Sequence, residues 1–298
     1  MPVRLAAARL AAVICVCAGT AGAAQAPDVQ PPPPPSSTPS QAVVEIDQTL
    51  ITLPTTMSLK RHHGYFHLTH RFARDLRRGD FGDLASDLFS LDNGAIIGLE
   101  YRYAVTDRLQ AGVHRSILGK TIVTFGRWDL LRQSDSGWLG ISAGASVEGQ
   151  NNLRQDHQPG VSTTFSHVHG TWLALYASPT YIHNAHTLTL RLEHEGHVHD
   201  VPGADDAADH SSAIDTVYVG LGTRVRVRET VSAVAEVAPR IGGYKPARAD
   251  WNAGIEKLTR GHVLQLNFGN NFNTTPGQIA RGGSTNEVYM GFNLSRKF

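Results

Sequence analysis

The chain has 298 residues, with 27 Lys and Arg against 26 Asp and Glu, so its formal net charge is +1. This balance excludes the strongly basic surface that is typical of a nucleic-acid-binding protein. Hydrophobic residues make up 41% of the chain, which is too many for a wholly disordered protein. The two cysteines, Cys15 and Cys17, lie near the start, so the rest of the sequence carries no disulfide or thiolate chemistry.

Residues 1–23 have the features of a secretory signal peptide. Arg4 and Arg9 form a positive region, an apolar stretch runs from Leu10 to Ala18, and Ala21-Gly22-Ala23 is a small-residue cleavage site. The apolar stretch is too short to span a bilayer as a helix. We therefore predict export and removal of residues 1–23, which also removes both thiols.

Residues 24–52 form a Pro-rich segment. Five consecutive prolines occupy positions 31–35, and serine and threonine follow them. Proline has no amide hydrogen, so this run joins neither a helix nor a sheet and favours a stiff, extended spacer. The sequence predicts a periplasmic segment over residues 24–52, followed by one domain over residues 53–298.

That domain consists of segments in which apolar and polar residues alternate. In residues 95–103, for example, Leu99 and Tyr101 share one face while Glu100 and Arg102 share the other. This period of two predicts β-strands. Twelve strands are expected, at 58–72, 94–105, 109–117, 121–132, 137–148, 168–182, 187–195, 214–228, 231–242, 249–258, 262–272 and 286–298.

The lengths of the connections alternate as well. Tight turns follow the even-numbered expected strands, whereas long loops follow most of the odd-numbered ones. A soluble β-sandwich has no need for long loops at one end only, and a lipocalin-like barrel has about eight strands. We therefore predict an all-β fold: a transmembrane antiparallel up-and-down β-barrel of about twelve strands, with short periplasmic turns and long external loops.

The chain ends in an aromatic residue, Phe298. Leu294, Phe292 and Met290 precede it on the same face of the last expected strand. This pattern is typical of bacterial outer-membrane barrels. It predicts an outer-membrane location, contact with membrane lipids, and recognition of the C-terminal strand by the barrel-assembly machinery; no nucleic-acid partner is expected.

Several stretches of the domain resemble a known family. They are residues 88–109, 130–133, 177–181, 236–240 and 254–267. Together they resemble bacterial β-barrel proteins of the DUF-5777 type over roughly residues 53–298. The resemblance implies an outer-membrane barrel and implies no enzymatic activity.

The polar faces of the expected strands carry charges that should line the lumen. The inferred luminal charges are Glu100, Arg102, Arg191, Glu193, Arg224, Arg226, Arg228, Glu236, Arg240 and Glu256, with Arg127 and Asp129 added if their face points inward. Arg224, Arg226 and Arg228 alternate along one strand and would favour anions in an open lumen. Glu193 and Glu236 are the nearest acids expected to face them.

Fifteen histidines are present, and one group is dense. Residues 194–210 contain His194, His197, His199, Asp200 and His210. Imidazole nitrogens and carboxylates are good ligands for zinc, copper or nickel. The group suggests a divalent metal site, while the alternative is a solvated external loop that merely tolerates histidine. No other cofactor is predicted.

No catalytic residue is predicted, because the sequence has no Gly-x-Ser-x-Gly, phosphate-binding loop or His-Glu-x-x-His motif. His114 and Ser116 are the residue types of a lipid hydrolase, but at expected luminal positions. The leading hypothesis is a non-catalytic barrel that acts as a narrow channel, a receptor or a structural element. The alternatives are a lipid-hydrolase barrel and a metal-capturing surface protein that uses residues 194–210.

A short helix is also expected in the first long loop. Phe81, Leu84, Ala85 and Leu88 are spaced so that they share one face of a helix within residues 78–90. An apolar helix face on an external loop needs cover. We expect this helix to fold over the mouth of the barrel or into its lumen.

Overall fold

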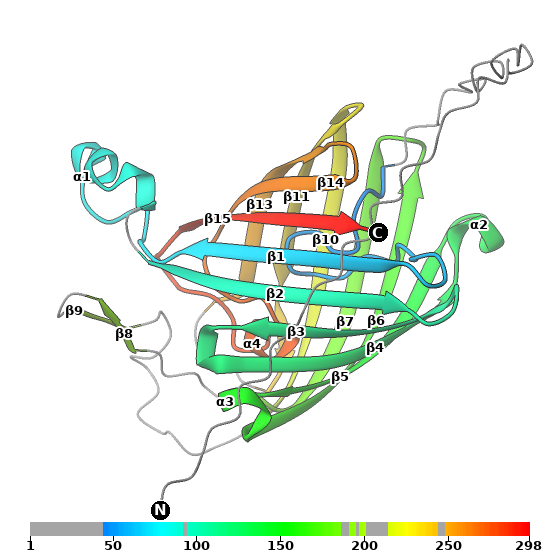
Figure 1. The fold of residues 1–298 in the computed structure, drawn as a ribbon, viewed down its shortest axis with the longest axis horizontal. Coiled ribbons are helices and arrows are strands. Elements are labelled where there is room, and N and C mark those ends of the chain that lie inside the picture. The colour runs from blue at the N-terminus through cyan, green and yellow to red at the C-terminus, as the bar shows by residue number, and fades with distance from the viewer. Residues whose placement is uncertain (1–43, 92–93, 186–190, 195–196, 201–213, 244–247) are drawn as a thin grey trace, which may run out of the picture. The chain divides into compact units, whose positions relative to one another are not determined.

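The computed structural model describes residues 44–91, 94–185, 191–194, 197–200, 214–243 and 248–298 (Figure 1). The expected signal peptide and residues 24–43 lie outside these ranges. Twelve antiparallel strands close into a barrel in which each strand pairs with the next along the chain, and the last pairs with the first. The predicted fold class, a twelve-stranded up-and-down barrel, is confirmed.

The barrel strands are β1 (Gly64–Phe72), β2 (Ala95–Ala104), β3 (Leu109–Ser116), β4 (Thr121–Leu131), β5 (Gly140–Gly149), β6 (Gln155–His169), β7 (Leu173–Ala185), β10 (Ile214–Arg228), β11 (Val231–Ala238), β13 (Asp250–Leu258), β14 (His262–Gly269) and β15 (Tyr289–Lys297). The other elements are the short strands β8 (Arg191–His194), β9 (His197–Asp200) and β12 (Arg240–Gly242), the helices α1 (Phe81–Ser86), α2 (Gln133–Ser136), α3 (Gln150–Leu153) and α4 (Pro276–Ile279), and the 3₁₀ turns η1 (Leu88–Ser90) and η2 (Leu118–Lys120).

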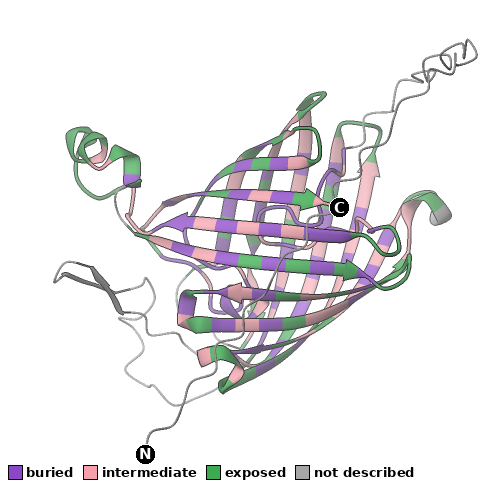
Figure 2. Cartoon of the chain, in the orientation of Figure 1, coloured by how far each residue is buried: buried purple, intermediate pink, exposed green. Residues whose placement is uncertain are grey.

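Buried and exposed residues alternate along the barrel strands (Figure 2). On β2, Leu99 and Tyr101 are exposed on the outer face, whereas Glu100 and Arg102 are buried on the luminal face. This arrangement is inside out relative to a soluble protein. It suits a wall whose apolar face contacts lipid and whose polar groups are satisfied inside.

The two rims of the barrel differ in the length of their connections. Residues 105–108, 132–139, 170–172, 229–230 and 259–261 connect strands at what we call the short-turn rim. The opposite, long-loop rim carries residues 73–94, 186–213, 239–249 and 270–288, together with two brief links at 117–120 and 150–154. The first strand starts and the last strand ends at the short-turn rim, as the even strand count requires.

One barrel strand was missed and one expected strand lies outside the barrel, so the total of twelve was right. Residues 155–169 form the long strand β6 instead of a loop, because Pro159 and Gly160 interrupt an alternation that is weakly apolar. Residues 191–194, expected within a barrel strand, pair only with β9 in a separate two-stranded sheet. β7 consequently runs from the short-turn rim to the long-loop rim, opposite to the expected direction.

The helix in the first long loop forms but does not cover the lumen. α1 has an Asp80 cap, and Asp80 and Asp83 each accept a hydrogen bond from the other's backbone amide. None of its residues is buried, and Phe81 is 74% exposed beside Phe89. The expectation that this helix plugs the mouth is therefore wrong. Of the helices in the described ranges, none has the length and apolar character needed to cross a membrane.

The outer face of β10 offers a test of membrane insertion. Leu221 lies at the centre of this strand, is exposed on the outer face, and is flanked across the sheet by Ala177 and Val237. Leu221→Arg is expected to destabilise the inserted barrel by about 2–4 kcal/mol, because a guanidinium would enter the apolar band. Leu221→Met is the matched control. Folding into lipid vesicles, followed by protease protection, measures both, and equal insertion would contradict the assigned outer face.

Candidate functional site

The lumen contains the chain's own N-terminal segment. Residues 44–59, called here the luminal segment, lie inside the barrel, and none of them is exposed. They make a tight turn in which the Leu50 amide donates to the Leu53 carbonyl oxygen and the Thr55 amide donates to the Gln48 carbonyl oxygen. We expected residues 24–52 to be periplasmic. Residues 44–52 instead lie in the lumen, because their apolar side chains find cover there.

One carboxylate holds the tip of this turn. Glu236, on the luminal face of β11, accepts hydrogen bonds from the amides of Ile51, Thr52 and Leu53 at 2.9–3.1 Å. It also accepts from the Thr52 hydroxyl and from the Asn252 side-chain amide. Bonds from several donors to one ionised acceptor are individually stronger than neutral ones. Glu236 therefore fixes the position of the luminal segment.

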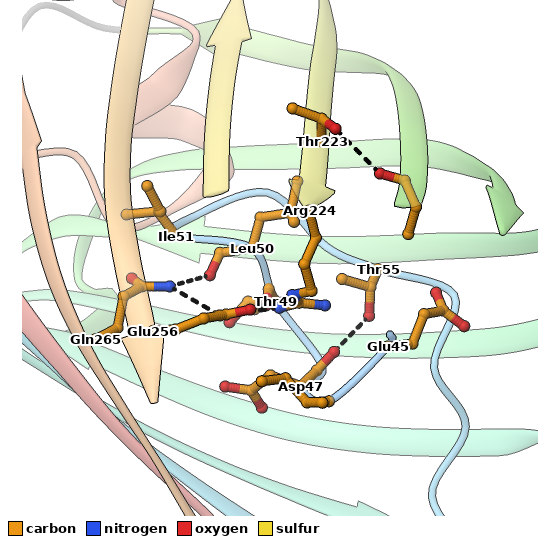
Figure 3. A network of polar contacts seen from close by, with 12 residues as sticks. Glu45, Asp47, Thr49, Leu50, Ile51, Thr55, Thr223, Arg224, Glu256 and Gln265 are labelled. Carbon is orange, nitrogen blue, oxygen red and sulfur yellow. Dashed lines mark hydrogen bonds and ion pairs between the residues drawn. The ribbon is translucent and has the colours of Figure 1, made fainter. Parts of the chain in front are cut away.

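Side chains of the wall also bind the carbonyl groups of the segment (Figure 3). The donors and their carbonyl acceptors are Lys297 to Ile46, Arg224 to Thr49, Gln265 to Leu50, Asn293 to Ile51 and Arg127 to Met57, at 2.8–3.0 Å. These donors come from four different strands. The barrel thus surrounds the backbone of the segment with polar partners on several sides.

The buried apolar residues also join the barrel wall to the segments that lie inside the barrel. All four clusters of buried apolar residues in the described part of the chain include a residue of the luminal segment or of the loop at 270–284. Leu50 packs with Tyr176 and Val234 of the wall, and Leu53 packs with Ile182 and Tyr218. The protein therefore has its core in the lumen, where the chain fills its own barrel.

Two glycines of β10 make room for these leucines. A Cβ atom at Gly222 would lie 2.1 Å from the Leu50 Cδ1 atom, and one at Gly220 would lie 2.7 Å from the Leu53 Cδ2 atom. Neither distance is compatible with the observed packing. The glycines therefore form two notches that receive the turn of the luminal segment.

Gly222→Ala tests this fit. The added methyl group is expected to displace Leu50 and to weaken the docking of the luminal segment by about 1–3 kcal/mol. Gly144→Ala is the matched control, because its Cβ would press only on the rotatable Ser162 hydroxyl, at 2.7 Å, with the Gly126 carbonyl oxygen in ordinary contact at 3.8 Å. Protease cleavage within residues 44–59 should rise for Gly222→Ala alone, and equal cleavage of both variants would argue against the notch.

A second filling enters from the long-loop rim. We call residues 270–284, which belong to the connection between β14 and β15, the inner loop; most of its residues are buried. Glu148 accepts hydrogen bonds from the Thr275 hydroxyl and the Gly277 amide at the start of α4. Asp250 accepts from the side-chain amides of Asn271 and Asn273. Buried carboxylates of the wall thus hold this loop as Glu236 holds the luminal segment.

A cavity of about 120 Å³ remains between the two fillings. Its lining includes Thr49, Ile51, Thr52 and Pro54 of the luminal segment and residues 274–276 of the inner loop. The wall contributes Glu100, Arg102, His67, His114, Arg127 and several serines and threonines, together with the apolar Val123, Phe125 and Ala145. A cavity of this size holds a few water molecules or a group about as large as benzene.

The luminal charges predicted from the sequence lie in three kinds of place. Glu100, Arg102, Arg224, Glu236 and Glu256 are buried on the luminal face, as are Arg127 and Asp129. Arg226 is half-buried, Arg228 is exposed at the short-turn rim, and Arg240 donates hydrogen bonds to the Arg248 and Arg281 carbonyl oxygens near the other rim. Arg191 and Glu193 lie on β8, outside the barrel sheet, so their expected place in the barrel wall is wrong.

The proposed arginine cluster is not an array of unneutralised charges. Arg224 forms an ion pair with Glu256, and neither side chain has any exposed surface. Glu256 was expected in the lumen but not as the partner of Arg224, and Glu236 binds the luminal segment instead. A filter made of three free guanidiniums is therefore contradicted. Within the wall, Arg102 likewise pairs with Glu100, and Arg127 with Asp129.

The histidine-rich group remains a prediction. His194 and His197 are opposite each other in the β8–β9 hairpin, and Asp200 is opposite Arg191. His199 is opposite Leu192 in the same hairpin, and His210 lies outside the described residues. Within the described ranges, no group of three His, Cys, Asp or Glu side chains is arranged to hold a metal ion.

The pair considered for lipid hydrolysis faces away from lipid. His114 and Ser116 are buried on the luminal face of β3. The His114 imidazole lies 3.4 Å from the Glu100 carboxylate and 3.2 Å from the Thr274 hydroxyl. These contacts give His114 a structural role between the wall and the inner loop.

Sequence reasoning missed the wall residues that hold the luminal segment through neutral amides. Gln265 and Asn293 were not among the predicted site residues, and Arg71, which donates to Asn293, was not counted among the luminal charges. A usable signal was present in residues 43–53, which contain six apolar residues and no proline. A solvated spacer has little reason to carry them.

Comparison with known proteins identifies the family to which the chain belongs. The sequence model described as "Membrane bound beta barrel domain (DUF5777)" matches residues 47–298. The chain belongs to the DUF5777 family. The match confirms the resemblance noted in the sequence, and it begins at Asp47, so the DUF5777 region includes most of the luminal segment. No curated protein matches the chain.

Solved structures with a similar course of the chain include a porin and an outer membrane protein. The NanC porin has 8% sequence identity and a TM-score of 0.48, over 79% of this chain and all of that one. Omp33 of Acinetobacter baumannii has 9% identity and a TM-score of 0.40, over 81% of this chain and all of that one. OmpF of Salmonella typhi, in complex with daunomycin, has 9% identity and a TM-score of 0.39, with the same coverage.

Proposed function

We propose that this chain is an outer-membrane channel whose lumen is closed by the luminal segment and opens when that segment leaves. The observation that carries the proposal is the position of residues 44–59, which fill the lumen without joining its wall. Their one bridge of the β type, Thr49 with Pro54, lies within the segment itself. Every strand of the barrel keeps both of its neighbours without them.

The proposal includes the route by which the chain reaches its place. Residues 1–23 direct export, and the C-terminal strand, which ends in the exposed Phe298, is the part recognised by the barrel-assembly machinery. The outer face of β15 carries Met290, Phe292 and Leu294 toward lipid. The short-turn rim then faces the periplasm, so the luminal segment enters the barrel from the periplasmic side.

Deletion of residues 44–55 tests the channel. In planar bilayers the full chain is expected to conduct only rarely, whereas the deletion variant is expected to conduct in steady steps. The matched control deletes residues 78–89, an equally long stretch of the external loop in which no residue is buried. The control should conduct like the full chain.

The inner loop at 270–284 is a second barrier, so a third variant replaces residues 272–282 by a short Gly-Ser linker. We expect this variant, combined with the 44–55 deletion, to conduct more than the deletion alone. If the combined variant folds and inserts but stays closed, the barrel is a structural element and the proposed channel is wrong.

A further inference from the structure

The wall makes more hydrogen bonds to the backbone of the luminal segment than to its side chains. Five wall side chains donate to its carbonyl groups, and Glu236 accepts from three of its consecutive amides. Six further hydrogen bonds join the wall to side chains of the segment: Ser295 to Asp47, Tyr176 to Glu45, Glu236 to Thr52, Ser166 to Thr56, Asp129 to Ser58 and Lys297 to Met57. Backbone groups are common to every peptide, so most of this cradle is independent of sequence.

The side chains that do fit closely are simple ones. Leu50 and Leu53 enter the notches above Gly222 and Gly220, which select for size and apolar character. The cavity of about 120 Å³ borders the turn at Thr49, Ile51 and Thr52. It leaves room for side chains larger than those of the resident segment. The wall therefore suits a range of peptides with apolar residues near a turn.

The polar groups of the wall also favour replacement of the luminal segment by another peptide. When the luminal segment leaves, Lys297 loses its acceptors on Ile46 and Met57, and Arg127, Gln265 and Asn293 each lose one acceptor. Glu236 loses its backbone donors at the same time. Buried groups of this kind are costly to leave unpaired. An incoming peptide restores the same pattern of donors and acceptors, whereas a sugar or a hydrocarbon does not.

We infer that the lumen is a binding site for short peptides and that residues 44–59 occupy it as a resident ligand of the same class. This inference rests on the proposed function, because the site is free for another peptide only when the segment leaves the lumen. It adds the class of solute that the channel takes.

The test uses a full chain that folds with its segment in place. A protease site is inserted in the exposed stretch at residues 60–63, and cleavage after refolding frees the segment. A fluorescent peptide of residues 44–59 is then added, and its anisotropy reports binding. A barrel refolded without residues 44–55 serves as the second preparation.

Two competitors decide the class of ligand. The first is a peptide of the same length and unrelated sequence that keeps leucine at the positions of Leu50 and Leu53; the second is an oligosaccharide of similar mass. We expect the unrelated peptide to displace the probe and the oligosaccharide not to. Glu236→Gln should weaken the binding of both peptides to a similar degree, by about tenfold.

Displacement by the peptide of residues 44–59 alone would overturn the inference, since the segment would then be a dedicated plug. Absence of probe binding in both preparations would overturn it as well. Neither result bears on the conductance of the 44–55 deletion variant. The proposed channel function and the proposed class of solute are therefore tested by separate experiments.

Discussion

Replacing Arg224 by methionine is expected to lower the free energy of unfolding by about 3–5 kcal/mol. Arg224 and Glu256 form an ion pair in which neither side chain is exposed, and Arg224 also donates to the Thr49 carbonyl oxygen at 2.9 Å. Methionine fills similar space but leaves the Glu256 carboxylate buried without a cation. Its remaining partner is the Gln265 side-chain amide, at 3.4 Å. Guanidinium unfolding of the refolded protein in detergent measures the loss.

The double variant Arg224→Met with Glu256→Met is the control for lost charge. It removes both ions and should recover most of the stability, because the cost lies in the unpaired carboxylate rather than in the loss of attraction. A loss below about 1 kcal/mol for the single variant would mean that water reaches Glu256, as at an exposed pair. In that case the Arg224–Glu256 pair would not be shielded from water by the luminal segment.

The strands were largely predictable because their signal is local. Alternation of Leu99, Glu100, Tyr101 and Arg102 fixes both the strand and its two faces without knowledge of any partner. The signal fails where alternation and pairing disagree. Residues 187–195 alternate well, yet the described part of them pairs with β9. Residues 155–169 alternate poorly around Pro159, yet they pair with β5 on one side and β7 on the other.

The candidate site was predictable only in part. The luminal orientation of Glu236, Arg224 and Glu256 was predictable, because side chains alternate between the two faces of a strand. Their partners follow from contacts between distant parts of the chain, such as the Ile51 amide with Glu236, 185 residues apart. The charges along the strand therefore predicted a cluster of unneutralised arginines, whereas in the structure Arg224 forms an ion pair with Glu256. The Pro-rich composition before residue 43 also concealed that the next residues belong to the barrel interior.

Loss of charge at Glu236 is expected to release the luminal segment. In Glu236→Gln one oxygen remains as an acceptor, while the new amide group meets the Ile51, Thr52 and Leu53 amides, all of which are donors. Replacing bonds to a charged acceptor by this mismatch should weaken docking by about 1.5–3 kcal/mol, which raises the released population by about tenfold or more. Bilayer recordings should show more frequent openings, and protease added at the short-turn rim should cleave residues 44–59 faster.

Glu148→Gln is the matched control for this change. Glu148 is also a buried luminal carboxylate, but it binds Thr275 and Gly277 of the inner loop and not the luminal segment. Cleavage within residues 44–59 should therefore stay at the level of the unmodified protein in Glu148→Gln. Faster cleavage in both variants would show that luminal charge in general, and not the Glu236 clamp, keeps the segment in place. Unchanged cleavage in Glu236→Gln would mean that the carbonyl contacts and the leucine notches hold the segment without it.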